Sequence, residues 1–243
     1  MARIETTRIE AISNRALERL YPEAFADPNS SWQQRKSAQT RIALLEATLE
    51  CFQRLGYART TTQAIADITK ISRGTMIYHF PTKLDLISAA IDYAFYKRME
   101  HYLQEIRQLP PERREDIDLA TEIFGKSINN SEFGALLELM MAARTDSELR
   151  SLLAPKAKRF EQLWTEEMAG VFVKFKGDRK LIEMVTDFAN AINEGLLISS
   201  WLWNISEKRQ AEIRTLAAKV IRLMRDGRLD QLENIEPKVR KKK

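Results

Sequence analysis

The segment Ser72–Pro81 carries side chains that suit contact with the edges of base pairs. If this segment is a short helix, Met76 and Phe80 form its inward side. The outward positions are then Arg73, Gly74, Thr75, Tyr78 and His79. Arginine can donate two hydrogen bonds to a guanine, threonine offers a hydroxyl and a methyl group, and glycine lets the backbone approach closely. The composition of the segment therefore indicates DNA-reading chemistry, although each charge taken alone is better explained as a solvated surface group.

Residues that could support catalysis or hold a metal ion are sparse. The two histidines, His79 and His101, stand in different contexts, and the sequence has no glycine-rich phosphate loop, nucleophile elbow or metal-ligand cluster. The single cysteine, Cys51, follows an apolar stretch and is expected in the core. We therefore expect that the protein is not an enzyme, with no catalytic residue, no cofactor and no metal site.

Positive charge is concentrated in two parts of this 243-residue chain, whose net charge is +5. Residues 33–83 hold eight Lys or Arg against three Asp or Glu, and the tail 237–243 holds five Lys or Arg. Local positive charge favours a polyanionic partner. No apolar run approaches the ~20 residues that cross a bilayer, so we expect a cytoplasmic protein with no membrane partner.

Apolar spacing of three and four residues recurs along the chain, without the alternation of strands, and predicts an all-α protein. Ser72 is a favourable N-cap, and Pro81 disfavours helical geometry at Phe80, so a short helix is expected between them. The other expected helices span residues 38–55, 62–69, 82–109, 115–129, 132–144, 146–175, 178–203 and 207–225. Residues 1–20 are compatible with a short amphipathic helix, and 21–31 with a linker.

The ordered motifs between Arg41 and Leu86 resemble the DNA-binding region of the tetracycline-repressor (TetR) family. Arg41 and the run L-L-E-A-T-L-E-C-F at residues 44–52 are similar to the first helix of the family. Gly56–Ala66 is similar to its turn and second helix, and Ile71–Phe80 to its recognition helix. Lys83 and Leu86 match the start of its fourth helix. The chain departs from the family pattern at Thr69-Lys70, where a small residue and glycine are usual, at Ile77 and at Leu84.

The resemblance implies a role in DNA binding for nine residues. Arg73, Gly74 and Thr75 would face bases or the adjacent backbone in the major groove. Thr61 and Thr62 would meet phosphate at a helix N-terminus. The side chains expected near phosphates are Tyr78, His79, Lys83 and Arg41.

The last two long helices carry apolar residues on more than one face, which favours packing against a second subunit. In residues 207–225 one stripe contains Ile213, Leu216, Val220 and Leu223, and a second contains Ala217, Ile221 and Met224. By resemblance, these helices would pair with their copies in a homodimer. The candidate interface residues are Ala189, Ile192, Gly195, Ala217, Val220, Ile221 and Met224.

Large aromatic and methionine side chains in the second half of the chain are candidates to line a ligand cavity. They are Phe124, Met140, Met141, Trp164, Phe188 and Trp201, with Phe172, Met184 and Trp203 as further candidates. Arg144 and Lys158 are candidates to meet a ligand carboxylate. Ordinary core packing, or surface charge for the two cations, is the alternative for each of them.

These expectations divide the chain into four parts. Residues 1–36 are an N-terminal extension, partly helical or disordered, and residues 37–97 are a three-helix helix-turn-helix domain. Residues 98–235 are a larger helical ligand-binding and dimerisation domain, and 236–243 are a basic disordered tail. The resemblance implies a repressor that binds a palindromic double-stranded DNA operator as a dimer and is released by a small, mostly hydrophobic effector. The alternative is a protein-binding adaptor with the same fold.

Overall fold

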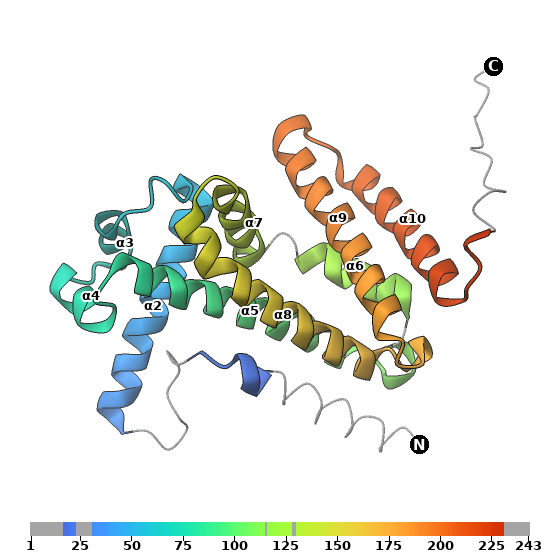
Figure 1. Ribbon diagram of the computed structural model, residues 1–243, viewed down its shortest axis with the longest axis horizontal. Coiled ribbons are helices and arrows are strands. Elements are labelled where there is room, and N and C mark those ends of the chain that lie inside the picture. The colour runs from blue at the N-terminus through green and yellow to red at the C-terminus, as the bar shows by residue number, and fades with distance from the viewer. Residues whose placement is uncertain (1–16, 23–30, 115, 128–129, 231–243) are drawn as a thin grey trace.

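The computed structural model describes residues 17–22, 31–114, 116–127 and 130–230, and within these ranges the regular structure is entirely helical (Figure 1). The N-terminal helices are α2 (Trp32–Leu55), α3 (Thr62–Thr69), α4 (Arg73–His79) and α5 (Lys83–Gln108). The remaining α-helices are α6 (Ile117–Ser127), α7 (Ser131–Ala143), α8 (Ser147–Val171), α9 (Arg179–Trp203) and α10 (Glu207–Arg225). Short 3₁₀ turns lie at Pro111–Arg113 and Val173–Phe175. The all-α prediction is confirmed.

Most helix boundaries lie within a few residues of those expected, and two differ by more. Helix α2 begins at Trp32 rather than at residue 38 because Ser31 and Gln34 form a reciprocal capping box. The helix expected over 146–175 ends at Val171, and a 3₁₀ turn follows. The short helix of residues 1–20 is described only at residues 17–20, and the basic tail lies outside the described residues.

Figure 1 places α3 and α4 at one end of the molecule and α9 and α10, side by side, at the other, with α5 running between the two ends. Helix α5 is buried along nearly its full length, from Leu86 to Ile106. Its apolar side chains belong to a single hydrophobic core. This core includes Phe52 at the end that carries α3 and α4, and Trp164 in the helices α6–α10, which we call the body. The boundary expected between residues 97 and 98 therefore falls inside a helix with a continuous core around it.

The helix-turn-helix end is also joined directly to the body by α7, which packs on α2. The backbone N–H of Tyr57, in the turn after α2, donates a hydrogen bond of 2.7 Å to Glu138 Oε1 on α7. Since this bond links segments 81 residues apart, α2 and α7 cannot move independently without breaking it.

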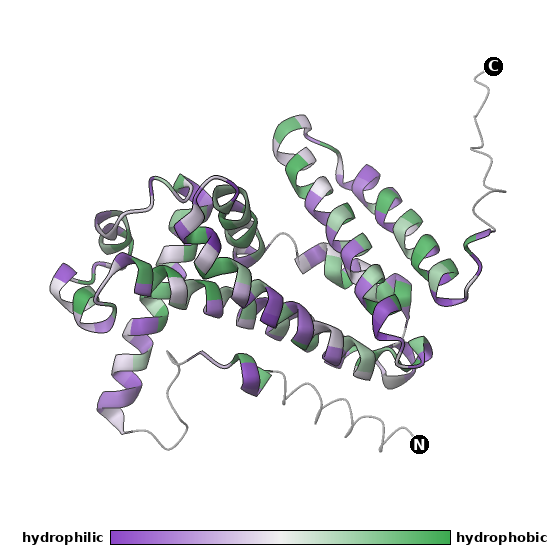
Figure 2. Ribbon diagram, viewed as in Figure 1, coloured by the Kyte–Doolittle hydropathy of each residue, from purple (hydrophilic) through white to green (hydrophobic). Residues whose placement is uncertain are grey.

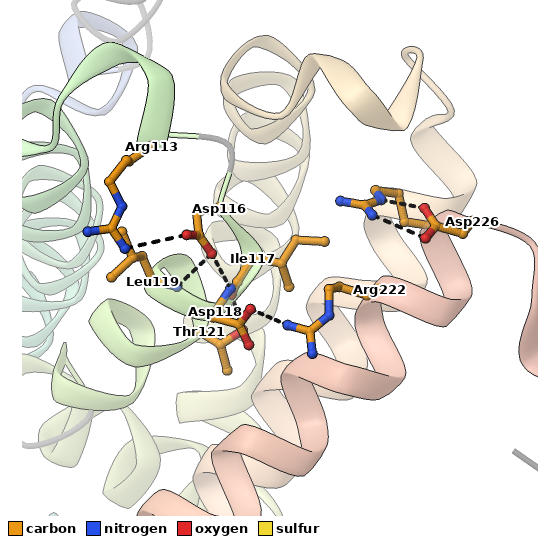
Figure 3. A network of polar contacts seen from close by, with 9 residues as sticks. Arg113, Asp116, Ile117, Asp118, Leu119, Thr121, Arg222 and Asp226 are labelled. Carbon is orange, nitrogen blue, oxygen red and sulfur yellow. Dashed lines mark hydrogen bonds and ion pairs between the residues drawn. The ribbon is translucent and has the colours of Figure 1, made fainter.

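At the far end of the body, polar contacts fasten α6 to α10 (Figure 3). Asp116 caps α6 by accepting hydrogen bonds from the backbone N–H groups of Asp118 and Leu119. The Asp118 carboxylate pairs with Arg222 of α10. In Figure 2, most helices carry both hydrophobic and hydrophilic residues, as expected where one side of a helix packs on its neighbours. No helix in the described part of the chain is long and apolar enough to span a membrane.

Candidate nucleic-acid interface

Two apolar side chains anchor helix α4 in the core, while its outer side is exposed to solvent. Met76 is only 1% exposed and Phe80 is buried, whereas Tyr78 is 82% exposed. Arg73, Gly74 and Thr75 are exposed on the first turn of the helix. Ser72 caps this turn by accepting a hydrogen bond of 3.1 Å from the Thr75 backbone N–H. The predicted division is therefore present at these positions, whereas His79, which was predicted to face outward, is only partly exposed.

The turn between α3 and α4 is built without the expected glycine. Lys70 adopts a left-handed conformation with φ of 58°, which costs a non-glycine residue about 1–2 kcal/mol. Thr69 offsets this cost, because its hydroxyl donates to the Ile65 carbonyl at 3.0 Å and accepts from the Ile71 N–H at 3.1 Å. The departure at Thr69-Lys70 thus preserves the turn geometry and adds a positive side chain at its tip.

Four of the predicted DNA-binding residues line one surface groove of about 340 Å³ at the junction of α3, α4 and α5. Thr61 and Thr62 come from the start of α3, Arg73 from the start of α4, and Lys83 from the start of α5. The Thr61 hydroxyl accepts from the Ala64 N–H at 3.1 Å and so occupies one of the free N–H groups at the start of α3, which leaves those of Thr62 and Gln63 for an anion. The groove combines two cations with a helix N-terminus, and both features favour a phosphate.

Gly74 leaves open space on the outer surface of α4. A Cβ atom placed there would meet only the Ser72 hydroxyl, at 3.9 Å. Packing therefore does not require glycine at this position, whereas a close approach of the backbone to a partner would.

Two of the predicted phosphate contacts have internal partners. The Arg41 guanidinium lies 4.8 Å from the centre of the Phe80 ring, and its Nη1 donates to the His79 carbonyl at 3.4 Å. Arg41 thus supports the C-terminal end of α4 instead of projecting freely. Burial, and secondarily the charge of Arg41, lowers the His79 pKa. Lys83 lies with its Nζ 5.6 Å from the centre of the Tyr57 ring, which holds it at the groove.

The body contains a largely apolar cavity of about 70 Å³ between α5, α6, α8, α9 and α10. Of the candidate ligand-binding residues, Phe124, Trp164 and Phe172 line it. Two residues expected at the dimer interface, Ala189 and Ile221, also line it. They face the interior of their own subunit because α9 and α10 close this side of the cavity.

Other candidate ligand-binding residues lie elsewhere. Met140 and Arg144 border a separate hollow between α7 and α8, and Met141 is 55% exposed. Trp201 is 59% exposed at the end of α9, and Phe188 packs against the core without lining the cavity. Periodicity could not separate these positions, since α7 and α9 carry apolar residues on several sides.

The candidate dimer residues divide by burial within the subunit. Ala217 and Met224 are buried against the same chain, whereas Ile192 and Val220 are partly exposed and Gly195 is exposed. Exposed apolar side chains that the candidate set omitted extend this surface: Trp201, Leu202, Trp203 and Leu216. In the sequence, the apolar stripe that contains Leu216 and Val220 was the signal that could have identified this exposed apolar surface.

Comparison with known proteins connects this geometry to one family. Residues 44–90 match the family described as bacterial regulatory proteins, tetR family. The HTH-type transcriptional regulator CymR of Pseudomonas putida is 25% identical over 80% of this chain and 95% of its own. An uncharacterized HTH-type transcriptional regulator of Mycobacterium tuberculosis is 29% identical over 121 residues, which are 50% of this chain and 62% of that protein.

Solved structures show the same fold. Salmonella enterica GusR superposes with a TM-score of 0.55 at 21% identity, over 79% of this chain and 96% of its own. The multidrug binding protein EbrR, solved with imidazole, superposes with a TM-score of 0.52 at 18% identity, over 73% of this chain and 93% of its own.

Proposed function

The chain belongs to the tetR family of bacterial regulatory proteins, and from this premise we propose that it is a transcription repressor. It binds a near-palindromic operator as a homodimer and is released from DNA by a small, mostly hydrophobic effector. Membership of a family of regulators agrees with the expectation that the protein is not an enzyme. Its place of action is the cytoplasm, where the operator DNA lies.

The outward surface of α4 is the observation that carries this proposal. Arg73, Gly74 and Thr75 form an exposed first turn on a helix held rigid by Met76 and Phe80. Arg73 reads a base edge, and the bare backbone at Gly74 allows the helix to enter the groove deeply. Thr61, Thr62 and Lys83 flank the helix and bind phosphates, which sets its orientation on the duplex without reading sequence.

The proposed domains differ in function in the same way, with DNA binding in one and effector binding and dimerisation in the other. Residues 37–97 bind DNA, and residues 98–235 bind the effector and form the dimer. The exposed apolar side chains of α9 and α10, including Leu216 at 53% exposure, pack on their copies in the partner subunit. The cavity lined by Phe124 and Trp164 receives the effector.

Selection of bound duplexes from a random DNA pool tests the proposal. The expected product is an inverted repeat whose half-sites lie about 34–36 Å apart, because two recognition helices related by a two-fold axis enter successive major grooves. Arg73→Ala should lose the preference at particular positions. Lys180→Ala is the matched control, since it also removes one exposed cation but lies at the start of α9.

A pool in which no sequence is enriched at physiological salt would contradict the proposal. Capture of a protein partner by the same α4 surface, with no enrichment of DNA, would favour the adaptor alternative.

A further inference from the structure

Helix α5 carries three buried tyrosines, and they differ in what their hydroxyl groups bind. The Tyr93 hydroxyl donates to Glu46 Oε1 and the Tyr96 hydroxyl to Glu100 Oε1, each at 2.9 Å. Tyr102 is only 4% exposed, and its hydroxyl has no hydrogen-bond acceptor among the residues that the structure describes. Burial alone raises the Tyr102 pKa, so the hydroxyl keeps its proton at neutral pH. Since buried donors in proteins are nearly always hydrogen-bonded, the Tyr102 hydroxyl is available to a further group.

Of these three tyrosines, Tyr102 is the one that lines the body cavity. Its oxygen is not among the partnerless atoms that their neighbours seal off completely, so the hydroxyl remains accessible at the cavity. The ring of Trp164, which also lines the cavity, lies 4.9 Å from that of Tyr102 between centres. The Trp164 indole N–H likewise has no acceptor in the described part of the chain. Two adjacent residues of the lining therefore carry donors without acceptors.

The other polar groups near the cavity are already used, and none of its lining residues is charged. The Thr121 hydroxyl donates to the Ile117 carbonyl at 2.7 Å, and Thr186 is partly exposed. Arg98, one helical turn before Tyr102, does not line the cavity, and its Nη2 donates to Asn190 Oδ1 at 2.8 Å. An ionic ligand would thus be buried without a counter-charge, which is costly. The lining suits an uncharged molecule that offers a hydrogen-bond acceptor.

We propose that the effector is a small neutral carbonyl compound, a ketone, aldehyde or ester, whose oxygen accepts a hydrogen bond from the Tyr102 hydroxyl. This inference rests on the proposed ligand control and names the chemical class of the ligand. The cavity of about 70 Å³ favours a compact molecule, and the flexible side chain of Met168 in its lining allows it to widen. Because α5 begins at Lys83, the bond also attaches the ligand to the helix that carries a proposed phosphate contact.

The test pairs each ketone with the alkene of nearly the same shape, in which a methylene group replaces the carbonyl oxygen. The probes are cyclohexanone with methylenecyclohexane and acetophenone with α-methylstyrene, titrated by calorimetry into the full-length protein without DNA. Each probe is measured with the unaltered protein and with Tyr102→Phe. Comparing the two proteins for one probe cancels the different hydration of ketone and alkene. Benzoate, which resembles acetophenone but carries a charge, is the ionic probe.

Tyr102→Phe should weaken the binding of at least one ketone by about 3- to 10-fold, the equivalent of one net hydrogen bond. Binding of the matching alkene should be unchanged or tighter, since the variant only makes the cavity more apolar. The melting temperature should be unchanged or raised, because the hydroxyl that is removed has no partner in the fold. Tyr96→Phe is the matched control: it removes a hydroxyl from the same helix, away from the cavity, and should leave the affinities for ketone and alkene unchanged.

Infrared spectroscopy of bound acetophenone, labelled with ¹³C at the carbonyl, reports the hydrogen bond itself. The carbonyl stretch should lie at lower frequency in the unaltered protein than in Tyr102→Phe. If Tyr102→Phe does not fold, a frequency below that of acetophenone in a hydrocarbon solvent supports the proposal, and an equal frequency contradicts it.

Three results would overturn the proposal: neither ketone binds, Tyr102→Phe weakens each ketone and its alkene by equal factors, or benzoate binds as tightly as acetophenone. Operator binding of the same preparations is measured separately. A protein that selects its operator but gives any of these results refutes this inference and leaves the DNA-binding function intact.

Discussion

Replacing Glu138 with alanine would remove the hydrogen bond that joins the DNA-binding end to the body. The Glu138 carboxylate accepts the Tyr57 backbone N–H at 2.7 Å. The same Oε1 atom lies 3.1 Å from the position that a Cβ on Gly56 would occupy, so the carboxylate fits closely against this turn. In the variant the Tyr57 N–H loses its acceptor, and the turn after α2 loses its connection to α7.

The magnitude follows from the character of the bond. Hydrogen bonds to charged groups contribute about 1.5–3 kcal/mol, and partial burial of this pair places it near the lower value. A loss of about 1.5 kcal/mol corresponds to a decrease in melting temperature of roughly 3–6 °C for a chain of this size. Glu138→Gln retains an oxygen acceptor and should cost less than about 1 kcal/mol.

Differential scanning calorimetry at fixed protein concentration measures these shifts, with concentration held constant because dimerisation also affects stability. Glu161→Ala is the control, since it removes an exposed glutamate from α8. A Glu138→Ala melting temperature within about 1 °C of that of the control would refute the reasoning, because the bond would then contribute less than about 0.5 kcal/mol.

Three further outcomes are expected. Arg73→Ala should weaken binding to particular bases by about 1–3 kcal/mol in a competition assay against a site library, whereas Lys83→Ala should weaken all sites similarly; equal profiles for the two variants would contradict their assigned roles. Leu216→Asp should yield folded monomers in analytical ultracentrifugation, since this side chain is 53% exposed in the subunit; a dimer would remove it from the interface. Burial, and then Arg41, lowers the His79 pKa below 6.5, so the neutral imidazole stabilises the fold and this contribution is lost as the pH falls below that value. In urea unfolding, the free energy of unfolding of His79→Asn should therefore decrease less at acid pH than that of the unaltered protein. An equal decrease in the two proteins would exclude His79 as a source of the acid sensitivity.

The DNA-binding end was predictable because its determinants are local. Ser72 caps α4, Pro81 ends it, and Met76 lies four residues after the cap, as the spacing of a helix requires. The position of Arg41 was not predictable in this way. Its partner His79 is 38 residues away, and only the packing of α2 on α3 and α5 brings the two together.

The sequence predicted the helices of the body, but it did not predict which of their residues line the cavity. Phe124 and Trp164 line the cavity while Met141 and Trp201 are exposed, although all four lie on helices rich in apolar residues. Which side of each helix faces the cavity depends on the rotation of the helix relative to its neighbours, and a single sequence does not encode that rotation in its periodicity.

The most direct test of the central claim is the ratio of two affinities measured at physiological salt. Fluorescence anisotropy would compare the duplex selected from the random pool with a duplex of the same composition and permuted sequence. The account predicts that the selected duplex binds at least about 10³-fold more tightly, as expected for base readout by Arg73 and its neighbours in a two-fold arrangement. Equal affinities would contradict it, because phosphate contacts alone would then explain all of the binding.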